Sequence, residues 1–191
     1  MKQGFALANQ TTKSFYAVLG ADPARAQRFA QAMEFFTSDA GYAMAHVVHA
    51  FDWSRLPSTA TIVDLGGSTG DAAFALAAQY PGFDIVVQEL PEVIAQARPR
   101  EGLNVRFMAH DFFAEQPVRG AAVYLFRWIL HNWPDKACVE ILRSLVPALV
   151  TGARVLVMDF VMPPPGVLPN EVERKLRYVH TCLGGGIGDG Y

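Results

Sequence analysis

The stretch Ile62-Val-Asp-Leu-Gly-Gly-Ser-Thr-Gly70 decides the fold of this chain. Residues 61–65 form a short β-branched and apolar run, and the glycines follow it directly. The alanine-rich residues 71–79 then have a helical composition. A strand that ends in glycines before a helix allows a ligand to approach the backbone closely. The stretch therefore predicts a strand, a ligand-binding turn and a helix.

Strand-like and helical segments continue to alternate after this stretch, and helical patterns precede it. Further strands are expected at 83–88, 104–108, 121–127 and 154–161, and helices at 24–36, 41–51, 92–97, 134–150 and 171–180. The run 121–127 is continuous and apolar, as expected of a strand buried on both faces. Because strands and helices alternate, the sequence predicts an α/β fold with a mostly parallel sheet built from right-handed βαβ units.

Three segments are expected along the chain. Residues 1–56 form a helical N-terminal segment, and residues 57–162 form the core with the glycine-rich turn. Residues 163–191 combine a proline-rich linker, a charged helix and a glycine-rich tail. The 191 residues are 51% hydrophobic and 18% charged, which is enough apolar material for a substantial core.

Charge and cysteine content narrow the expected partners and compartment. The formal net charge is −2, so neither nucleic acid nor an anionic membrane is expected as a partner. Cys138 and Cys182 have no metal-type spacing, and no disulfide framework is expected. The first residues are too polar for a secretory signal, and the apolar run 121–130 is too short to span a bilayer. A cytoplasmic location is therefore expected.

The glycine pattern itself excludes two kinds of nucleotide site. In the dinucleotide fingerprint Gly-x-Gly-x-x-Gly, counted from Gly66, the second glycine falls on Ser68 and the third on Asp71. A phosphate-binding P-loop is excluded because no Gly-Lys-Ser/Thr follows. The remaining pattern places Asp64 inside the strand end, where a carboxylate suits an amine or a cationic ligand better than a pyrophosphate.

Acidic residues also follow the next two expected strands. Glu89 lies 25 residues after Asp64, where it is placed to accept both hydrogen bonds of a ribose diol. Asp111 and Phe112 follow the third strand, where they could bind the amine and the face of an adenine. Taken singly, Glu89 or Asp111 could equally be a helix cap or a solvated loop acid. Acids at three successive strand ends favour a shared ligand instead.

Five blocks stand in a specific order along the chain. They are Val63-Asp-Leu-Gly-Gly-Ser-Thr-Gly70, Gln88-Glu-Leu-Pro-Glu-Val93, His110-Asp-Phe-Phe113, Phe126-Arg-Trp-Ile-Leu-His-Asn-Trp-Pro-Asp135 and Gly152-Ala-Arg-Val-Leu-Val-Met-Asp159. Together they resemble plant and fungal small-molecule O-methyltransferases of the caffeate and flavonoid type. The resemblance runs from about Phe5 to about Val179. It implies a Rossmann-like class I methyltransferase core with S-adenosylmethionine (SAM) as cofactor and no metal.

The resemblance also implies roles for particular residues. His131 matches the family's general base, and Asp159 matches an acid that orients this histidine. Arg127 stands where the family usually has lysine near the cofactor. The residues expected to bind the cofactor are Asp64, Gly66, Gly67, Gly70, Glu89, Leu90, Asp111, Phe112 and Arg127. Without the resemblance, His131 is more simply a structural histidine at the end of the fourth strand.

The implied chemistry is methyl transfer to a hydroxyl of a small acceptor, expected to be a phenol of secondary metabolism. A free phenol has a pKa near 10 and an ordinary histidine one near 6.5, about three units apart. The histidine can accept the proton as the oxygen attacks, which contributes about 10²–10⁴-fold. A carboxylate on its other nitrogen fixes the tautomer and stabilises the imidazolium.

Two parts of the family pattern are expected to be missing from this chain. The family begins with a dimerisation domain, and it continues past residues 171–180 into an antiparallel strand pair and further acceptor contacts. The chain is therefore expected to be truncated at both ends, which leaves the fifth strand with an open edge. Two alternatives stay open. One is a SAM-binding pseudoenzyme or partner subunit, as a homodimer or with another subunit, and the other is a non-methylating cyclase on the same fold.

Overall fold

The computed structural model describes residues 7–13, 18, 21–37, 43–159, 161 and 163–174. The chain forms two compact units, one of Met44–Pro164 and one of Met1–Ala43 with Pro165–Tyr191. In the second of these, helix α3 (Pro23–Thr37) begins after Asp22, whose Oδ1 accepts the backbone N–H of Arg25 at 3.0 Å. This carboxylate satisfies one of the donors that a helix start leaves unpaired, and the helix expected at 24–36 is confirmed with slightly wider bounds.

A five-stranded parallel sheet forms the centre of the unit Met44–Pro164, with the order β3-β2-β1-β4-β5. The strands are β1 (Thr61–Leu65), β2 (Asp84–Glu89), β3 (Val105–Ala109), β4 (Val123–Arg127) and β5 (Arg154–Met158). The predicted α/β class with a mostly parallel sheet is confirmed. The order reverses direction at β1, and ligands of such sheets bind at the carboxyl ends of the strands at this point.

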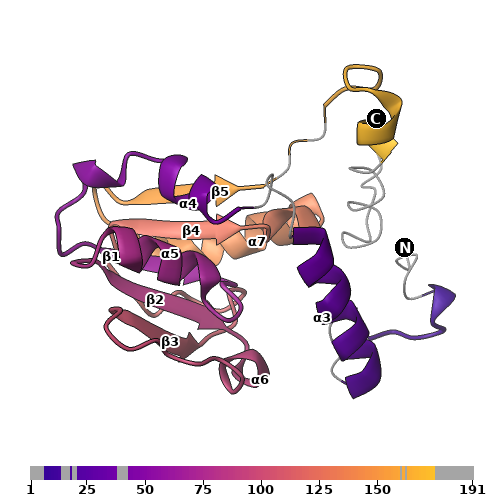
Figure 1. Cartoon of the computed structure of the whole chain (residues 1–191), viewed down its shortest axis with the longest axis horizontal. Helices are drawn as coiled ribbons and strands as arrows, with labels where there is room; N and C mark the ends of the chain where they lie inside the picture. Colours follow the sequence, from indigo (N-terminus) through magenta and orange to yellow (C-terminus); the bar gives the residue numbers. More distant parts are fainter. Residues whose placement is uncertain are drawn as a thin grey trace. The chain divides into compact units, whose positions relative to one another are not determined.

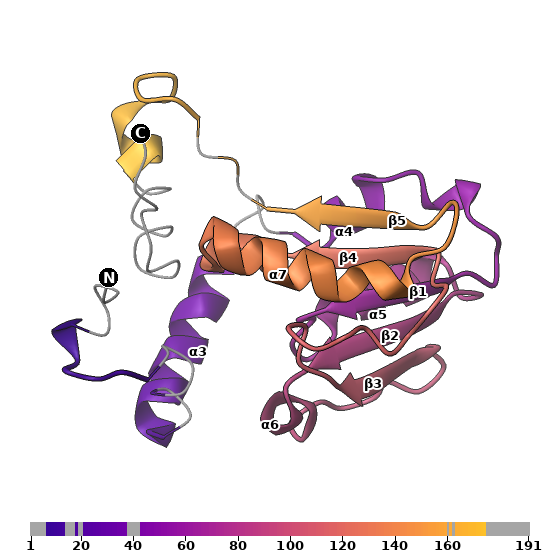
Figure 2. The same cartoon turned by 180° about the vertical axis from the view of Figure 1, so that it is seen from behind.

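Helices cover both faces of the sheet. Helix α5 (Asp71–Gln79) lies on one face together with α4 (Ala45–His49), as Figure 1 shows. Helix α7 (Asp135–Leu145) lies on the opposite face, in front of the sheet in Figure 2. Ile62, Ile85 and Val123 pack under α5 and are fully buried, and their β-branched side chains suit this two-sided burial.

Several element boundaries differ from those expected. The expected helix 134–150 ends at Leu145 and continues as the 3-10 turn η4 (Val146–Ala148), because Pro147 has no N–H to donate to the preceding turn. The expected helix 92–97 is the shorter α6 (Pro91–Ile94). The expected fifth strand 154–161 ends at Met158, because the next carboxylate turns to bind a neighbouring loop.

Other differences lie near the ends of the chain. The expected helix 41–51 is α4, Ala45–His49, within residues 43–51 that are described. The unit Met44–Pro164 begins before the expected boundary at residue 57, because Val47 and Trp53 are buried in it. Of the expected helix 171–180, residues 171–174 are helical and the remainder lies outside the described residues.

The two edge strands of the sheet are β3 and β5. Among the described residues β5 pairs with β4 alone, and Val155 and Val157 are 36% and 51% exposed on the α7 side. No helix in the described ranges combines the length and apolarity needed to cross a membrane.

Candidate functional site

The turn after β1 leaves the sheet through glycines. Gly66 and Gly70 have φ angles of +69° and +92°, a left-handed backbone that glycine adopts without steric cost. The N–H groups of Gly66 and Gly67 both donate to the backbone carbonyl of Gln88, at 2.8 and 3.3 Å. A Cβ on Gly66 would lie 2.4 Å from Ile129 Cδ1. At its glycines the turn therefore presents bare backbone, where the surrounding side chains leave no room for a Cβ.

Asp64 lies directly beneath this turn. Its side chain is 2% exposed, and its Oδ2 has no hydrogen-bond partner among the described residues. A Cβ on Gly67 would lie 2.5 Å from this oxygen. Burial raises the pKa of Asp64 to about 7, although the positive charge of Arg127 opposes the shift. A cationic ligand would stabilise the ionised form of Asp64, because it supplies the partner that Oδ2 lacks.

Glu89 and Leu90 follow the end of β2. Glu89 is half-buried, and burial raises its pKa against the opposing hydrogen bonds from the Leu90 and Ser68 backbones. Its Oε2 accepts the N–H of Leu90 at 2.8 Å. The Leu90 side chain is 38% exposed. A carboxylate and an apolar side chain thus stand together beside the glycine turn.

Asp111 and Phe112 follow the end of β3. Asp111 is exposed, and its Oδ1 accepts the N–H of Phe113 at 3.0 Å. The Phe112 ring meets Trp133 edge-on with centroids 5.9 Å apart, and its Cε1 lies 3.6 Å from the Cβ position of Gly66. The loop after β3 therefore reaches the glycine turn, as the sequence predicts.

In the turn after β4, a tryptophan takes the left-handed backbone conformation. Trp128 has a φ of +57°, although it carries a large side chain. Its N–H donates to Met158 O at 3.0 Å, and its carbonyl accepts Asn132 Nδ2 at 3.1 Å. The Arg127 guanidinium lies 3.8 Å from the centre of the Trp128 ring, a cation–π contact. Burial lowers the pKa of Arg127, while Asp64 and Asp71 oppose this shift.

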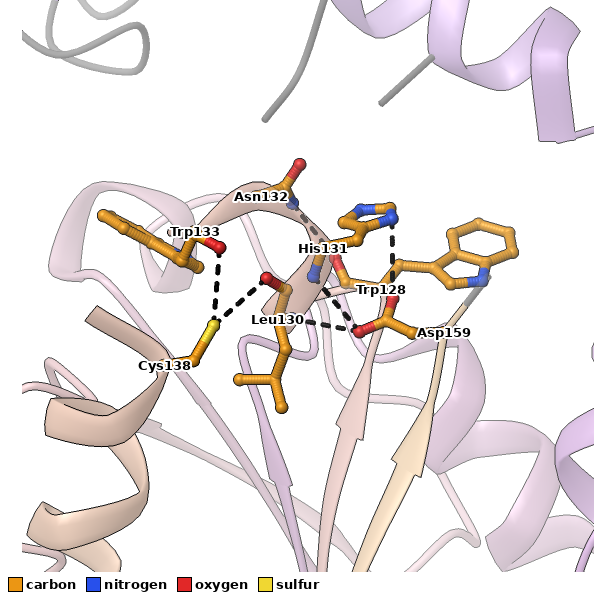
Figure 3. A network of polar contacts seen from close by, with 7 residues as sticks. All are labelled: Trp128, Leu130, His131, Asn132, Trp133, Cys138 and Asp159. Atoms are coloured by element: carbon orange, nitrogen blue, oxygen red, sulfur yellow. Dashed lines mark hydrogen bonds and ion pairs between the residues drawn. The ribbon is translucent and has the colours of Figure 1, made fainter. Parts of the chain in front are cut away.

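His131 and Asp159 meet at the carboxyl ends of β4 and β5, as Figure 3 shows. His131 Nδ1 lies 3.5 Å from Asp159 Oδ1, and each side chain is 12% exposed. Asp159 Oδ2 accepts the N–H of Leu130 at 3.1 Å and that of His131 at 3.3 Å. The carboxylate thus holds both the backbone and the ring of the 3-10 turn η3 (Leu130–Asn132).

The pKa of Asp159 is raised by burial, and His131 and the two backbone N–H groups oppose the shift. At 3.5 Å the contact with Nδ1 is long, and Asp159 Oδ1 has no hydrogen bond among the described residues. Asp159 therefore binds the backbone at Leu130 and His131 through Oδ2, while its Oδ1 lies close to the His131 ring.

Sequence reasoning missed three residues that support this turn. Trp128 takes the left-handed backbone, and Asn132 bonds to its carbonyl. Cys138 Sγ lies 3.4 Å from Leu130 O and from Trp133 O, and burial raises the pKa of this thiol (Figure 3). No local sequence signal marks a positive φ at a tryptophan or a thiol beneath a loop. Among the described residues, no three His, Cys, Asp or Glu side chains gather as a metal site would require.

Comparison with known proteins identifies the family of this site. A family model for the O-methyltransferase domain matches residues 5–181. The chain belongs to the O-methyltransferase family. A curated member of this family, O-methyltransferase gsfB of Penicillium aethiopicum, is 50% identical over 179 residues, which are 93% of this chain and 42% of that protein. The chain thus spans less than half the length of this relative.

Solved structures of the O-methyltransferase fold agree. Mitomycin 7-O-methyltransferase MmcR has a TM-score of 0.77 and 30% identity, over 97% of this chain and 52% of that one. A structure named a pericyclic reaction enzyme has a TM-score of 0.72 and 28% identity, over 96% and 48%. Related structures hold SAM or S-adenosylhomocysteine (SAH). SAM is therefore the cofactor of this family, and the orphaned Asp64 and the crowded Gly66 and Gly67 fit it.

Proposed function

We propose that this chain transfers a methyl group from SAM to a hydroxyl of a small phenolic acceptor, with His131 as the general base. The observation that carries the proposal is the pairing of His131 with Asp159 at the strand ends that also hold the glycine turn. A histidine can take the proton of a hydroxyl, and a carboxylate beside it stabilises the imidazolium that forms.

The strand-end residues would hold the cofactor as follows. Asp64 faces its cationic end, since its buried oxygen lacks a partner. The backbone of Gly66, Gly67 and Gly70, which carries no side chains, would lie against it. Glu89 would accept hydrogen bonds from the ribose hydroxyls. The adenine and the entrance to the site would be lined by Leu90, Asp111, Phe112 and Arg127. SAM, when bound, supplies a methyl group that its positively charged sulfur already makes electrophilic.

His131 handles the proton of the acceptor. Its Nδ1 faces Asp159, so its Nε2 is the nitrogen that takes the proton from the hydroxyl as the oxygen attacks. The Asp159 carboxylate then stabilises the imidazolium that forms. Because Asp159 also binds the backbone of Leu130 and His131, its carboxylate is held beside the His131 ring.

The acceptor class and cellular location belong to the same proposal. One relative is named an O-methyltransferase, and one solved structure is named for 7-O-methylation of mitomycin, a small molecule. We propose a phenolic secondary metabolite as the acceptor and the cytoplasm as the location. A second copy or another subunit as a partner is part of the proposal too.

Incubation of the purified chain with methyl-labelled SAM and a panel of phenols tests the proposal. We expect label in the phenol, and a loss of about 10²–10⁴-fold in His131→Ala, the range of general-base contributions. His49→Ala serves as the matched control, because His49 is an exposed histidine on α4. Transfer that is equal in His131→Ala and in the unmodified chain contradicts the assignment of the base.

The same samples separate the two alternatives. Binding of SAM in calorimetry without transfer to any phenol favours a SAM-binding partner that does not catalyse. A product without the mass of an added methyl favours a rearrangement, for which the neighbour named a pericyclic reaction enzyme is the motivating observation. Absence of SAM binding contradicts all three.

A further inference from the structure

A pair of buried amide side chains lies on the α7 face of the sheet, near the carboxyl ends of the strands. Gln88, near the end of β2, and Gln116, in the loop before β4, are each 1% exposed. Gln88 Nε2 donates to Gln116 Oε1 at 2.8 Å, and Gln116 Nε2 donates back to Gln88 Oε1 at 2.8 Å. Gln116 Oε1 also accepts the N–H of Val118 at 2.9 Å. The two amides thus form a closed ring of hydrogen bonds that water does not reach.

The backbone of each glutamine connects this ring to one side of the cofactor site. The Gln88 carbonyl is the acceptor for the N–H groups of both Gly66 and Gly67. The Gln116 N–H donates to Ser144 O at 3.0 Å. Ser144 Oγ in turn lies 3.1 Å from Phe112 O, 3.2 Å from Phe113 O and 2.9 Å from Glu140 O, three carbonyls that compete for its one proton. A series of polar contacts therefore runs from the glycine turn to the loop after β3.

Neither amide reaches the cofactor side itself. Val87 packs in the core under α5, and Gln88, the next residue in the strand, points to the α7 face. Any effect of the pair on the cofactor must therefore pass through Gly66, Gly67 and Phe112. Two apolar side chains could fill the same space, but they could slide past each other. A ring of two hydrogen bonds holds its partners at one spacing.

We propose that Gln88 and Gln116 are positioning residues for the cofactor, because their amide ring fixes the glycine turn at a set distance from the loop Asp111–Phe113. The inference rests on the SAM-binding part of the proposed function. It concerns the pocket before the cofactor arrives, so it can be measured through binding and without catalysis.

The variant Gln88→Glu tests the amide ring with a chemical switch. A protonated glutamic acid reproduces the ring, since its O–H donates to Gln116 Oε1 and its carbonyl accepts from Gln116 Nε2. An ionised glutamate cannot donate and turns an oxygen toward Gln116 Oε1. Burial keeps such an acid protonated to well above its ordinary pKa. We expect SAH to bind the variant as it binds the unmodified chain at pH 5.5, and about tenfold more weakly at pH 9.

Calorimetric dissociation constants for SAH are compared with those of the unmodified chain at each pH, which removes the effect of other titrating groups. These groups, on the elements around the pair, are Asp64, Glu89, His110, Glu115, Glu140 and Arg143. Protection of the Gly66 and Gly67 amide hydrogens from exchange, measured without SAH, reports on the turn directly. We expect this protection to fall in the variant at pH 9.

Tyr124→Phe is the matched control. The Tyr124 hydroxyl is also buried, and it donates to Val118 O at 2.8 Å and lies 3.1 Å from Ala148 O, but it has no bond to the glycine turn. We expect this variant to melt at a lower temperature with unchanged affinity for SAH. If Gln88→Glu is too unstable at pH 9, the double variant Gln88→Leu/Gln116→Leu replaces it, and weaker SAH binding at every pH is expected.

Three results would overturn the inference. The first is equal affinity for SAH in Gln88→Glu and the unmodified chain at both pH values. The second is an equal loss of SAH affinity in Tyr124→Phe and in Gln88→Glu when both variants lose the same amount in melting temperature. The third is unchanged protection of Gly66 and Gly67. Failure of the unmodified chain to bind SAH is a separate outcome, which refutes the cofactor assignment and the inference together.

Discussion

The turns after β1 and β4 both leave their strands with a left-handed backbone, but the first residue of each turn is of an opposite kind. After β1, Gly66 takes a φ of +69° at no steric cost, and Ser68 and Gly70 follow with +52° and +92°. After β4, Trp128 takes a φ of +57° and keeps a large ring. The second solution is strained, and such strain costs roughly 1–3 kcal/mol.

The contacts of the two turns explain this difference. The β1 turn removes side chains so that a ligand can lie against the backbone. The β4 turn is held from several sides, by Arg127 on the ring, by Asn132 on the carbonyl and by Asp159 on the following N–H groups. We infer that the first turn serves ligand access and that the second positions the side chain of His131. The predictions below test this division.

Gly67→Ala is expected to have the largest effect, because it closes the accessible turn. The added Cβ would lie 2.5 Å from Asp64 Oδ2 and 2.9 Å from Val87 Cγ1, closer than packed atoms allow. Overpacking of this kind costs about 1–3 kcal/mol, and the displaced backbone no longer fits its ligand. We expect SAH affinity to fall about 100-fold or more in calorimetry.

The control for this variant is Gly152→Ala. Gly152 has a φ of +88° and nothing within 4 Å of its Cβ position, so it reports the general effect of losing a glycine. We expect no change in its SAH affinity. A Gly67→Ala protein that binds SAH within threefold of the unmodified chain contradicts the role of the β1 turn in access.

Asp159→Asn is expected to have an intermediate effect, confined to the β4 turn. The asparagine oxygen can still accept from Leu130 and His131, but the neutral amide no longer stabilises an imidazolium. We expect methyl transfer to fall roughly 10²-fold, at the low end of general-base effects, with SAH affinity unchanged. Asp135→Asn, an exposed acid at the start of α7, is the control. Loss of SAH affinity in Asp159→Asn would show that the two turns are not separate.

The smallest expected effect is the pH dependence that Asp64 gives the β1 turn. Its pKa of about 7 in the folded protein lies above its ordinary value of 3.8, so the folded state binds a proton that the unfolded state releases. The free energy of unfolding without ligand should therefore fall as the pH rises from about 4 to 7. A cationic ligand prefers the ionised acid, so SAM affinity should rise several-fold from pH 6 to 7.5, before its amine titrates near 8.

Chemical denaturation and calorimetry across this pH range measure the two opposite trends. Asp64→Asn should flatten both curves, because the amide does not titrate. If the curves of Asp64→Asn keep their slopes, another group is responsible, and Asp64 is not the titrating partner of the cofactor.

Sequence reasoning predicted the strand ends more completely than the contacts between them. The glycine pattern and the acids Asp64, Glu89 and Asp111 lie in short local motifs, and a parallel sheet brings such motifs to one edge. Asp159 was expected beside His131, and the structure brings the two together. Its hydrogen bonds to the Leu130 and His131 backbones end β5 early, and this depends on a loop 28 residues away.

Two of the remaining features, at Gln88 and Trp128, depend on tertiary contacts that have no local signal. A glutamine in an apolar strand, such as Gln88, looks like an exposed position until Gln116 is placed opposite it. Pro147 does carry a local signal, because it interrupts the backbone hydrogen bonds of a helix, and the predicted helix 134–150 should have been ended before it. The positive φ of Trp128 follows from its contacts and from nothing in the surrounding residues.

The stacking of Trp128 on Arg127 also gives the molecule an optical reporter. Indole emission depends on the charges and the solvent around the ring. Trp53 is 1% exposed in the core, so its emission forms a constant background. Trp128 is half-buried, 3.8 Å from the Arg127 guanidinium, and Trp133 meets Phe112 edge-on. We expect the combined emission of Trp128 and Trp133 to change when SAH binds, so that the binding titrations can be followed without an attached dye.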